Sequence, residues 1–234
     1  MNGAMADEVV FRILLVVILV GAAAVRMVYA VSSKRSGGRL SVSENKVVMG
    51  VMGVVGLVGA YLLIGYLVFP GWVAWAALPL PSWLRWVGVA MGITTIPLLF
   101  WVHRTLGKYF SAALQVRDEH VLVTSGPYRW VRHPMYTVLL MLMVALLPIS
   151  GNWAIGAVFV GVAAAFIPIR VGKEEAMMME KFADDYRAYQ RRTGRLLTLK
   201  FLSLIVVSCL VVFFVLWLLA TYVFGFLPVD LRFF

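Results

Sequence analysis

Residues 120–136, HVLVTSGPYRWVRHPMY, form a polar, ring-rich stretch between segments that are otherwise strongly apolar. The chain breaks at Gly126-Pro127 and restarts at His133-Pro134, immediately before an apolar run. Proline fits the first turn of a helix, because its missing N–H would have no partner there, and it keeps the preceding residue out of the helical region. The stretch therefore predicts a loop that leads into a helix, with His133 at the N-cap and free backbone N–H groups that can bind an anion.

The composition around this stretch is typical of a membrane protein. The 234 residues are 62% hydrophobic and 14% charged, with a mean hydropathy of +0.92, which is too apolar for a water-soluble domain. A net charge of +10 would suit nucleic acid in a soluble protein, but here it first indicates which loops face the cytoplasm. We therefore expect no nucleic-acid partner. The single cysteine, Cys209, supports neither a disulfide framework nor a metal cluster.

Six apolar segments predict an all-α, polytopic membrane protein with about six transmembrane helices. A helix needs about 20 residues to cross a hydrocarbon core of about 30 Å, and only the fourth segment is much shorter. The fourth and fifth form a helical hairpin around a turn that begins at Pro148, and a charged amphipathic helix continues to Arg192. The segments are 9–31, 47–69, 83–102, 135–147, 153–169 and 196–227.

Arginines in the first apolar segment and glycines in the second indicate what each helix contacts. Arg12 and Arg26 lie near the two ends of the first segment, where long side chains can reach the headgroups, so we interpret both as snorkelling residues. Four glycines, three residues apart from Gly50 to Gly59, follow one face of the second segment. They predict close packing against another helix of the same chain.

Positive charges alternate between the loops. Lysines and arginines number four in 32–46, none in 70–82, five in 103–134, none in 148–153 and eight in 170–200. Because positively charged loops stay in the cytoplasm, this alternation predicts that both termini lie outside and that the ring-rich stretch faces the cytoplasm.

A second group of charged residues, Arg170, Glu174 and Glu175, lies where the returning helix of the hairpin leaves the bilayer. Arg170 and Glu174 are four residues apart and so share a helix face. On an ordinary helix surface such an ion pair contributes roughly 0.3–0.5 kcal/mol and needs no function. At the end of a membrane span, however, burying a charge costs free energy unless the charge is paired or in contact with water. The position of these residues therefore favours a functional role.

The stretch at 120–136, followed by RVGKEE at 170–175 and FADDYRAYQRR at 182–192, resembles the isoprenylcysteine carboxyl methyltransferase family. Members of that family are integral membrane enzymes that use S-adenosylmethionine, and they are related to phospholipid methyltransferases. The resemblance extends over 115–192, where the TSGxYxxxRHPxY, Arg-xxx-Glu-Glu and Phe-xxx-Tyr-xx-Tyr motifs occur in order around one hairpin. The chain departs from the family pattern at 195–198, where the usual proline is absent, and in its additional last segment.

The resemblance implies that the chain has three parts, and it implies a set of site residues. The parts are N-terminal transmembrane helices at 1–102, a methyltransferase core at 103–195 and an extra C-terminal transmembrane helix at 196–234. Arg170 and Glu174 would be the catalytic pair, with Arg170 facing the methyl acceptor and Glu174 contacting the cofactor. The residues that would enclose the cofactor are Gln115, His120, Val121, Leu122, Val123, Tyr128, His133, Pro134, Met135, Tyr136 and Glu174.

The expected function is methyl transfer from S-adenosylmethionine to a lipophilic acceptor within the membrane. In-line transfer from a sulfonium depends on alignment, with the nucleophile about 3–3.5 Å from the methyl carbon. A carboxylate acceptor, such as a prenylcysteine or a lipid acid, needs no general base, and Arg170 would anchor it through two parallel hydrogen bonds.

Other functions remain open at this point. The acceptor could be a phospholipid amine or a small thiol. A membrane reductase of the sterol type would use a nicotinamide cofactor, and such enzymes need not carry the GxGxxG motif that is absent here. A non-enzymatic membrane protein would need neither the His-Pro loop nor the Arg-Glu pair. No metal is expected, because only His103 lies outside the loop and no cysteine or paired carboxylate has ligand spacing.

Overall fold

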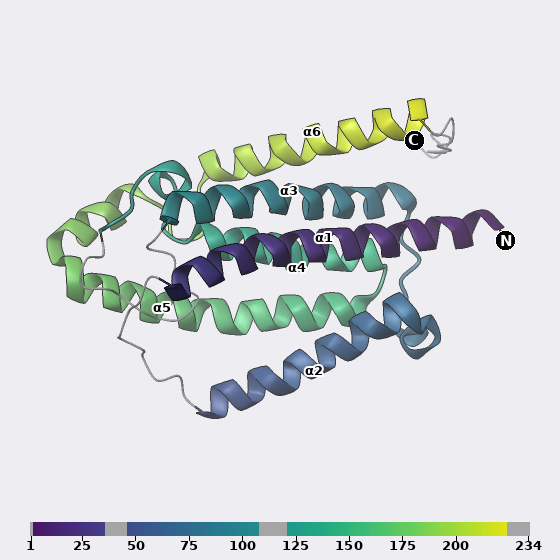
Figure 1. The fold of residues 1–234 in the computed structure, drawn as a ribbon, viewed down its shortest axis with the longest axis horizontal. Helices are drawn as coiled ribbons and strands as arrows, with labels where there is room; N and C mark the ends of the chain where they lie inside the picture. Colours follow the sequence, from purple (N-terminus) through teal and green to yellow (C-terminus); the bar gives the residue numbers. More distant parts are fainter. Residues whose placement is uncertain (1, 36–45, 108–120, 224–234) are drawn as a thin grey trace.

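The computed structural model describes residues 2–35, 46–107 and 121–223. Within these ranges every regular element is a helix, and no β-strand forms (Figure 1). Among the described helices, five are long and apolar enough to cross a membrane. The predicted all-α, polytopic fold is therefore confirmed, and the protein is an integral multi-pass membrane protein.

Each of the six predicted apolar segments forms a helix. The fourth has 17 residues and is about 25 Å long at 1.5 Å per residue, slightly less than the hydrocarbon core. The helices are α1 (Asn2–Arg35), α2 (Lys46–Val68), α3 (Ser82–Leu106), α4 (Pro134–Ser150), α5 (Trp153–Arg192) and α6 (Leu199–Val223). Short 3-10 turns are η1 (Pro70–Trp72), η2 (Ala74–Ala76) and η4 (Gly126–Arg129).

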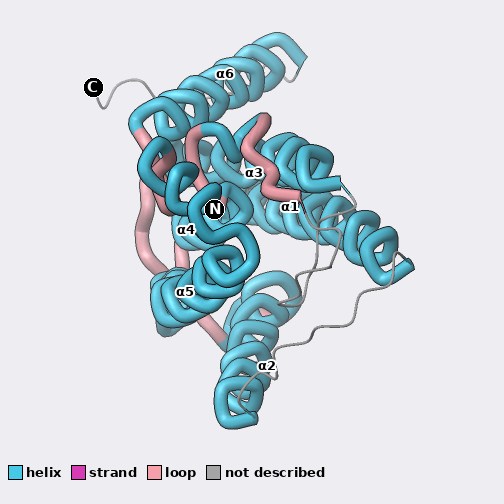
Figure 2. The backbone as a smooth tube through the Cα atoms, turned by 90° about the vertical axis from the view of Figure 1, so that its left-hand side faces the viewer, coloured by secondary structure: helices cyan, strands magenta, loops and turns pink. Residues whose placement is uncertain are grey.

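Helices α3 and α4 form the centre of the bundle. α3 packs against α1, α4 and α6, and α4 packs against α1, α3 and α5. α2 and α6 lie at opposite edges of the bundle, α2 against α5 and α6 against α3 (Figures 1 and 2). Because lipid is as apolar as these side chains, the packing depends on van der Waals contact and hydrogen bonds more than on the removal of apolar surface from water.

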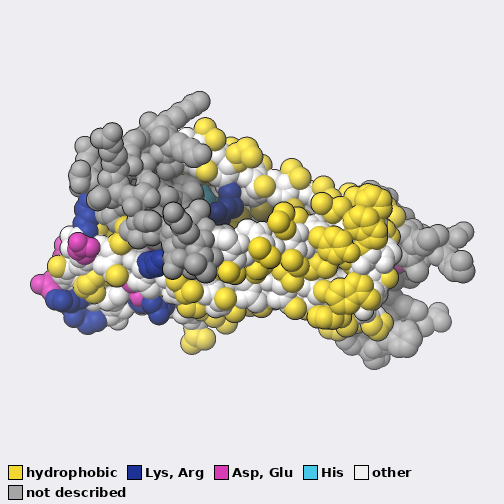
Figure 3. Space-filling view, turned by 90° about the horizontal axis from the view of Figure 1, so that it is seen from below, with side chains coloured by type: hydrophobic (Ala, Val, Ile, Leu, Met, Phe, Trp, Pro, Cys, Tyr) yellow, Lys and Arg dark blue, Asp and Glu magenta, His cyan; other side chains and the backbone are white. Residues whose placement is uncertain are grey.

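The surface of the bundle divides into an apolar body and a charged end. Large apolar side chains are exposed along α1, α2 and α6, as expected for helices that face lipid. Figure 3 shows apolar side chains over most of one face and charged side chains gathered at one end. We call this the charged end; it contains the C-terminal part of α5, which carries Arg191 and Arg192.

Helix α5 is long enough to leave the membrane. The part of its 40 residues before the break at Ala183, from Trp153 to Phe182, extends about 45 Å, more than the roughly 30 Å of the hydrocarbon core. The predicted amphipathic continuation to Arg192 is confirmed as a helix, but it contains a break at Ala183, whose φ of +40° is non-helical. The sequence did not predict this break, since alanine is a strong helix former.

The hairpin between α4 and α5 turns three residues later than predicted. α4 continues through Pro148 and ends at Ser150, and Gly151 closes it in the left-handed conformation with a hydrogen bond from its N–H to the Leu147 carbonyl, 2.9 Å. Proline near the end of a helix removes only one backbone hydrogen bond. Asn152 then caps α5 by accepting from the Ile155 N–H, 3.1 Å, so the turn needs only two residues.

The predicted close packing along the glycine face of α2 is wrong for most of its length. A Cβ at Gly59 would lie 3.1 Å from the Phe159 ring of α5, but Cβ atoms at Gly50, Gly53 and Gly56 would meet no described atom within 4 Å. The reason is the tilt of α2, which approaches the bundle at its C-terminal end and diverges from it toward Lys46 (Figure 1).

Candidate active site

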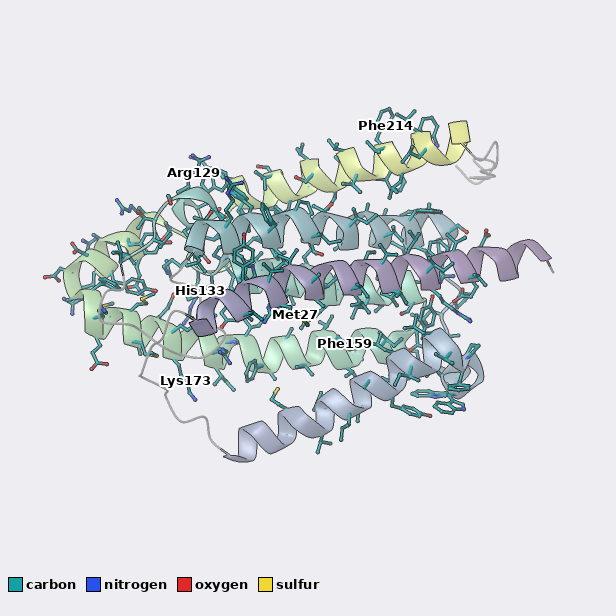
Figure 4. All side chains as sticks on the ribbon, in the orientation of Figure 1. Met27, Arg129, His133, Phe159, Lys173 and Phe214 are labelled. Carbon is teal, nitrogen blue, oxygen red and sulfur yellow. The ribbon has the colours of Figure 1, made fainter. Side chains whose placement is uncertain are left out.

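His133 lies at the junction of the ring-rich loop and α4. Its backbone occupies the N-cap of α4 with Pro134 at the first helical position, as predicted, but its ring makes no capping hydrogen bond. The ring instead lies between two carboxylates of α5, with Nδ1 3.4 Å from Glu174 Oε2 and Nε2 3.2 Å from Glu175 Oε1. Figure 4 shows His133 at the charged end of the bundle, where its side chain is buried, whereas Lys173 points away from the bundle.

Tyr136 connects Arg170 and Glu174. It lies one turn after His133 on α4, and its hydroxyl donates a hydrogen bond to Glu174 Oε1. The same hydroxyl accepts from Arg170 Nε at 3.1 Å, while Arg170 Nε lies 3.8 Å from Glu174 Oε1. The two charged residues of α5 are therefore bridged by a phenol as well as by their own ion pair.

Glu175 is the centre of an ion-pair network that sequence analysis did not find. Arg132 Nε donates to Glu175 Oε1 at 2.9 Å, and Arg195 Nη2 lies 3.1 Å from Oε2. Arg132 Nη1 also donates to the carbonyls of Gln190, 3.2 Å, and Thr193, 2.5 Å. The sequence feature that could have indicated this network is Arg132, which directly precedes His133 in the loop motif and to which the sequence analysis assigned no role.

The segment after α5 pairs with the loop through its backbone. The Gly194 N–H donates to the Trp130 carbonyl at 3.0 Å, and the Gly194 carbonyl accepts from the Arg132 N–H at 2.9 Å. The His133 N–H donates to the Arg195 carbonyl at 3.1 Å. These short parallel contacts hold the N-cap of α4 in place, and no periodicity in the sequence predicts them.

Burial and charge shift the pKa values of two loop residues. Burial raises the pKa of Tyr128 well above its ordinary value, so its phenol stays neutral. Burial disfavours the charged ring of His133, but the hydrogen bonds that Glu174 and Glu175 accept from it, together with their negative charge, outweigh this and raise its pKa. The Tyr128 carbonyl accepts from the Tyr189 hydroxyl at 2.6 Å, which connects the loop to the end of α5.

The structure brings together four of the predicted site residues, His133, Tyr136, Arg170 and Glu174. The remaining described members lie nearby in the loop or at the start of α4. Val121 is exposed, whereas Leu122, Val123 and Met135 are half-buried and Tyr128 and Pro134 are buried. Gln115 and His120 lie outside the described residues.

Arg26 was not among the predicted site residues, and its predicted snorkelling is wrong. Its Nη1 atom is buried and has no hydrogen-bond partner in the described part of the chain. Tyr136 and Arg170 are its electrostatic neighbours. The guanidinium therefore faces the interior of the bundle because α1 packs against α3 and α4 on that side.

Fold and site together define a class: a multi-pass α-helical membrane protein with a charged, partly buried site at one end of its bundle. Residues 87–180 match the model of the isoprenylcysteine carboxyl methyltransferase (ICMT) family. The resemblance predicted from the motifs is confirmed over these residues. The match includes α3, α4 and the first part of α5, but not α1.

Named relatives agree with this family. The protein-S-isoprenylcysteine O-methyltransferase of Rattus norvegicus is 30% identical over 51% of this chain and 43% of its own length. That of Dictyostelium discoideum is 31% identical over 56% of each chain. The uncharacterized protein YpbQ of Bacillus subtilis is 26% identical over 42% of this chain and 58% of its own. The chain thus spans about half the length of the curated relatives it matches.

One solved structure shares the fold. It is that of the eukaryotic intramembrane Ras methyltransferase ICMT, with a TM-score of 0.51 and 24% identity over 64% of this chain and 53% of that chain. At this identity the likeness concerns the fold alone. It agrees with the helical architecture that the sequence predicted.

Proposed function

We propose that this chain is an integral membrane methyltransferase that transfers the methyl group of S-adenosylmethionine to a carboxylate on a lipophilic acceptor. The observation that carries the proposal is the contact of Tyr136 with both Arg170 and Glu174, next to His133 and within the residues that match the family. The relatives named for O-methylation of isoprenylcysteine support a prenylcysteine-like carboxylate.

The residues at the start of α4 fit a cationic cofactor. When bound, S-adenosylmethionine would supply an electrophilic methyl group on a positively charged sulfonium. Glu175 is neutralised by two arginines and is 14% exposed, whereas Glu174 is 28% exposed, lies 3.4 Å from the ring of His133 and has one weak arginine contact, with Arg170 at 3.8 Å. Glu174 is therefore the carboxylate whose charge remains open to a cationic ligand, and Tyr128, His133 and the backbone around Pro134 would complete the wall.

Arg170 is suited to hold the acceptor. Its planar guanidinium matches the two oxygens of a carboxylate, and the hydrogen bond from Nε to the Tyr136 hydroxyl fixes the orientation of the plane. A carboxylate held in this way needs no base, because it is already a nucleophile. The contribution of the chain is therefore alignment and charge, not proton transfer.

The position of the site suits a lipophilic acceptor. The charged end of the bundle lies beside apolar helix surfaces, so an acceptor dissolved in the membrane would approach sideways while a water-soluble cofactor would approach from the end. The alternation of loop charges supports a cytoplasmic location for this end, with both termini outside.

Methyl transfer into a defined panel tests the function. Purified protein is incubated with methyl-labelled S-adenosylmethionine and, separately, a prenylcysteine, a fatty acid, phosphatidylethanolamine and a small thiol. We expect label in the first or second acceptor, released by mild base as only a methyl ester would be. Label that resists base, found in the amine or the thiol, would contradict carboxylate methylation.

A further inference from the structure

Arg26 places a guanidinium inside the bundle. It lies in the candidate span Asp7–Val31, five residues before the end of that range and so about 7.5 Å from it. Its Nη1 atom is buried and unpartnered among the described residues. A buried polar atom without a partner is costly, and charged residues within a membrane span usually serve a ligand or a path.

Among the described residues, the surroundings of Arg26 add a second positive charge, and no carboxylate forms an ion pair with its guanidinium. Its electrostatic neighbours are the Tyr136 hydroxyl and the Arg170 guanidinium, and Arg170 Nε donates a hydrogen bond to that hydroxyl at 3.1 Å. On α3, the ring of His103 also feels the charge of Arg26. Glu174 contacts Tyr136, Arg170 and His133 and is not among the groups that act on Arg26. Two guanidinium groups therefore share one neighbourhood, in which the described carboxylate Glu174 pairs with Arg170.

The position of Arg26 also indicates the source of an anion. Its neighbour Met27, labelled on α1 in Figure 4, is 66% exposed, so this part of α1 borders the lipid. A ligand that reaches Arg26 from this side is membrane-dissolved.

We infer that Arg26 is a second acceptor-binding residue, which together with Arg170 holds the carboxylate of the lipophilic acceptor. This inference rests on the proposed function and extends it to α1, which lies outside the residues that match the family. A carboxylate has two oxygens and accepts a charge-assisted hydrogen bond from each of two guanidinium groups. The bound carboxylate also offsets the repulsion between the two guanidinium groups. The site would therefore bind an anionic acceptor in preference to an amine.

The test compares two ligands that differ only in charge. A prenylcysteine and its carboxamide are titrated by calorimetry into the full chain in nanodiscs, for wild type, Arg26→Met, Arg26→Lys and, as a control on the same helix, Arg12→Met. We expect Arg26→Met to lower the carboxylate-to-carboxamide affinity ratio by roughly 10- to 100-fold. Affinity for the carboxamide and for S-adenosylhomocysteine should stay within about twofold, because neither depends on a second cation.

The control variants make the result specific. Arg26→Lys keeps the charge and should retain part of the ratio, which also covers the case in which Arg26→Met does not fold. Arg12→Met should leave the ratio unchanged. An unchanged ratio in folded Arg26 variants, no preference for the carboxylate in wild type, or a selective loss of S-adenosylhomocysteine binding would each overturn the inference.

Because these measurements need no turnover, they are separate from the methyl-transfer assay. A wild-type protein that prefers the carboxylate through Arg26 but transfers no methyl group would reject the proposed function and leave carboxylate binding by Arg26 supported.

Discussion

Adjacent residues Glu174 and Glu175 have different surroundings and therefore different expected roles. Glu175 contacts Arg132, Arg195 and His133, so its charge is used to hold the loop against α5. Glu174 contacts the neutral Tyr136 hydroxyl and the ring of His133. A carboxylate that is surrounded by cations stabilises the fold, whereas one with spare negative charge can meet a cationic ligand.

Glu175→Gln should destabilise the protein strongly. The change leaves Arg132 and the other cations without their shared partner, and breaking a buried ion pair costs about 3–5 kcal/mol. Asp184→Asn is the matched control on α5, because the Arg187–Asp184 pair is 60% and 91% exposed and such pairs contribute about 0.2–1 kcal/mol. Thermal unfolding in detergent measures both, and similar losses would show that the network around Glu175 contributes little.

Arg170→Lys and Glu174→Gln should separate acceptor binding from cofactor binding. Lysine keeps the charge but loses the planar fork, so turnover on a carboxylate should fall roughly 10- to 150-fold with nearly unchanged cofactor affinity. Glu174→Gln should weaken cofactor binding as well, because it removes negative charge near the sulfonium. Calorimetry with S-adenosylhomocysteine and initial rates measure the two effects, and wild-type turnover by Arg170→Lys would rule out the role of Arg170.

His133 should make stability depend on pH. Although burial lowers its pKa, Glu174 and Glu175 raise it overall, so the folded state binds the proton more tightly than the unfolded state, whose histidine pKa is about 6.5. The resulting stabilisation is fully present below about pH 6.5 and is lost as pH rises through the raised pKa. The melting temperature of wild type should therefore fall more between pH 6 and pH 9 than that of His133→Asn. Parallel curves would contradict the shift.

At the scale of elements, the sequence predicted helices more reliably than their contacts. Hydropathy located all six apolar helices, and the proline rule placed His133 at the N-cap. Local patterns cannot report the pairing of Gly194 with the loop, because it depends on residues more than 60 positions apart. They also failed for the glycines of α2, since the tilt of a helix is set by packing at its ends. The roles of the site residues remain predictions.

The hairpin of α4 and α5 should depend on the absence of a side chain at Gly156. A Cβ there would lie 2.7 Å from the Leu147 Cβ, so Gly156→Ala forces the two helices apart and should cost about 1–3 kcal/mol. Gly53→Ala is the control, because its Cβ would meet no described atom within 4 Å, and alanine should be neutral or stabilising by up to about 1 kcal/mol. Unfolding in detergent measures both, and equal stability of the two variants would contradict the tight hairpin.

At the scale of the whole molecule, polar contacts close the bundle at both ends. Opposite the charged end, Arg85 Nη1 donates to Glu8 Oε2 at 2.6 Å, and its Nη2 donates to the Tyr66 hydroxyl at 3.1 Å and to the Ile149 carbonyl at 2.8 Å. These bonds connect α1, α2, α3 and α4. The guanidinium of Arg85 has its partners inside the protein, so polar contacts hold this end of the bundle together without a positively charged loop. The positive charges of the loops therefore lie at the other end, where they set the orientation of the protein in the membrane.

Orientation in the membrane follows from this asymmetry and is testable with cysteines. In a Cys209→Ser background, Gly71→Cys lies in the uncharged connection between α2 and α3, where a side chain meets no described atom within 4 Å, and Ala188→Cys lies on an exposed face of the α5 extension. A membrane-impermeant maleimide added to right-side-out vesicles should label Gly71→Cys only, and added to inverted vesicles it should label Ala188→Cys only. Labelling of both cysteines from the same side would contradict the predicted topology, because three membrane-spanning helices, α3, α4 and α5, would place Gly71 and Ala188 on opposite sides of the bilayer. The reverse pattern would place Arg170 and Glu174 outside the cell, away from a cytoplasmic pool of cofactor.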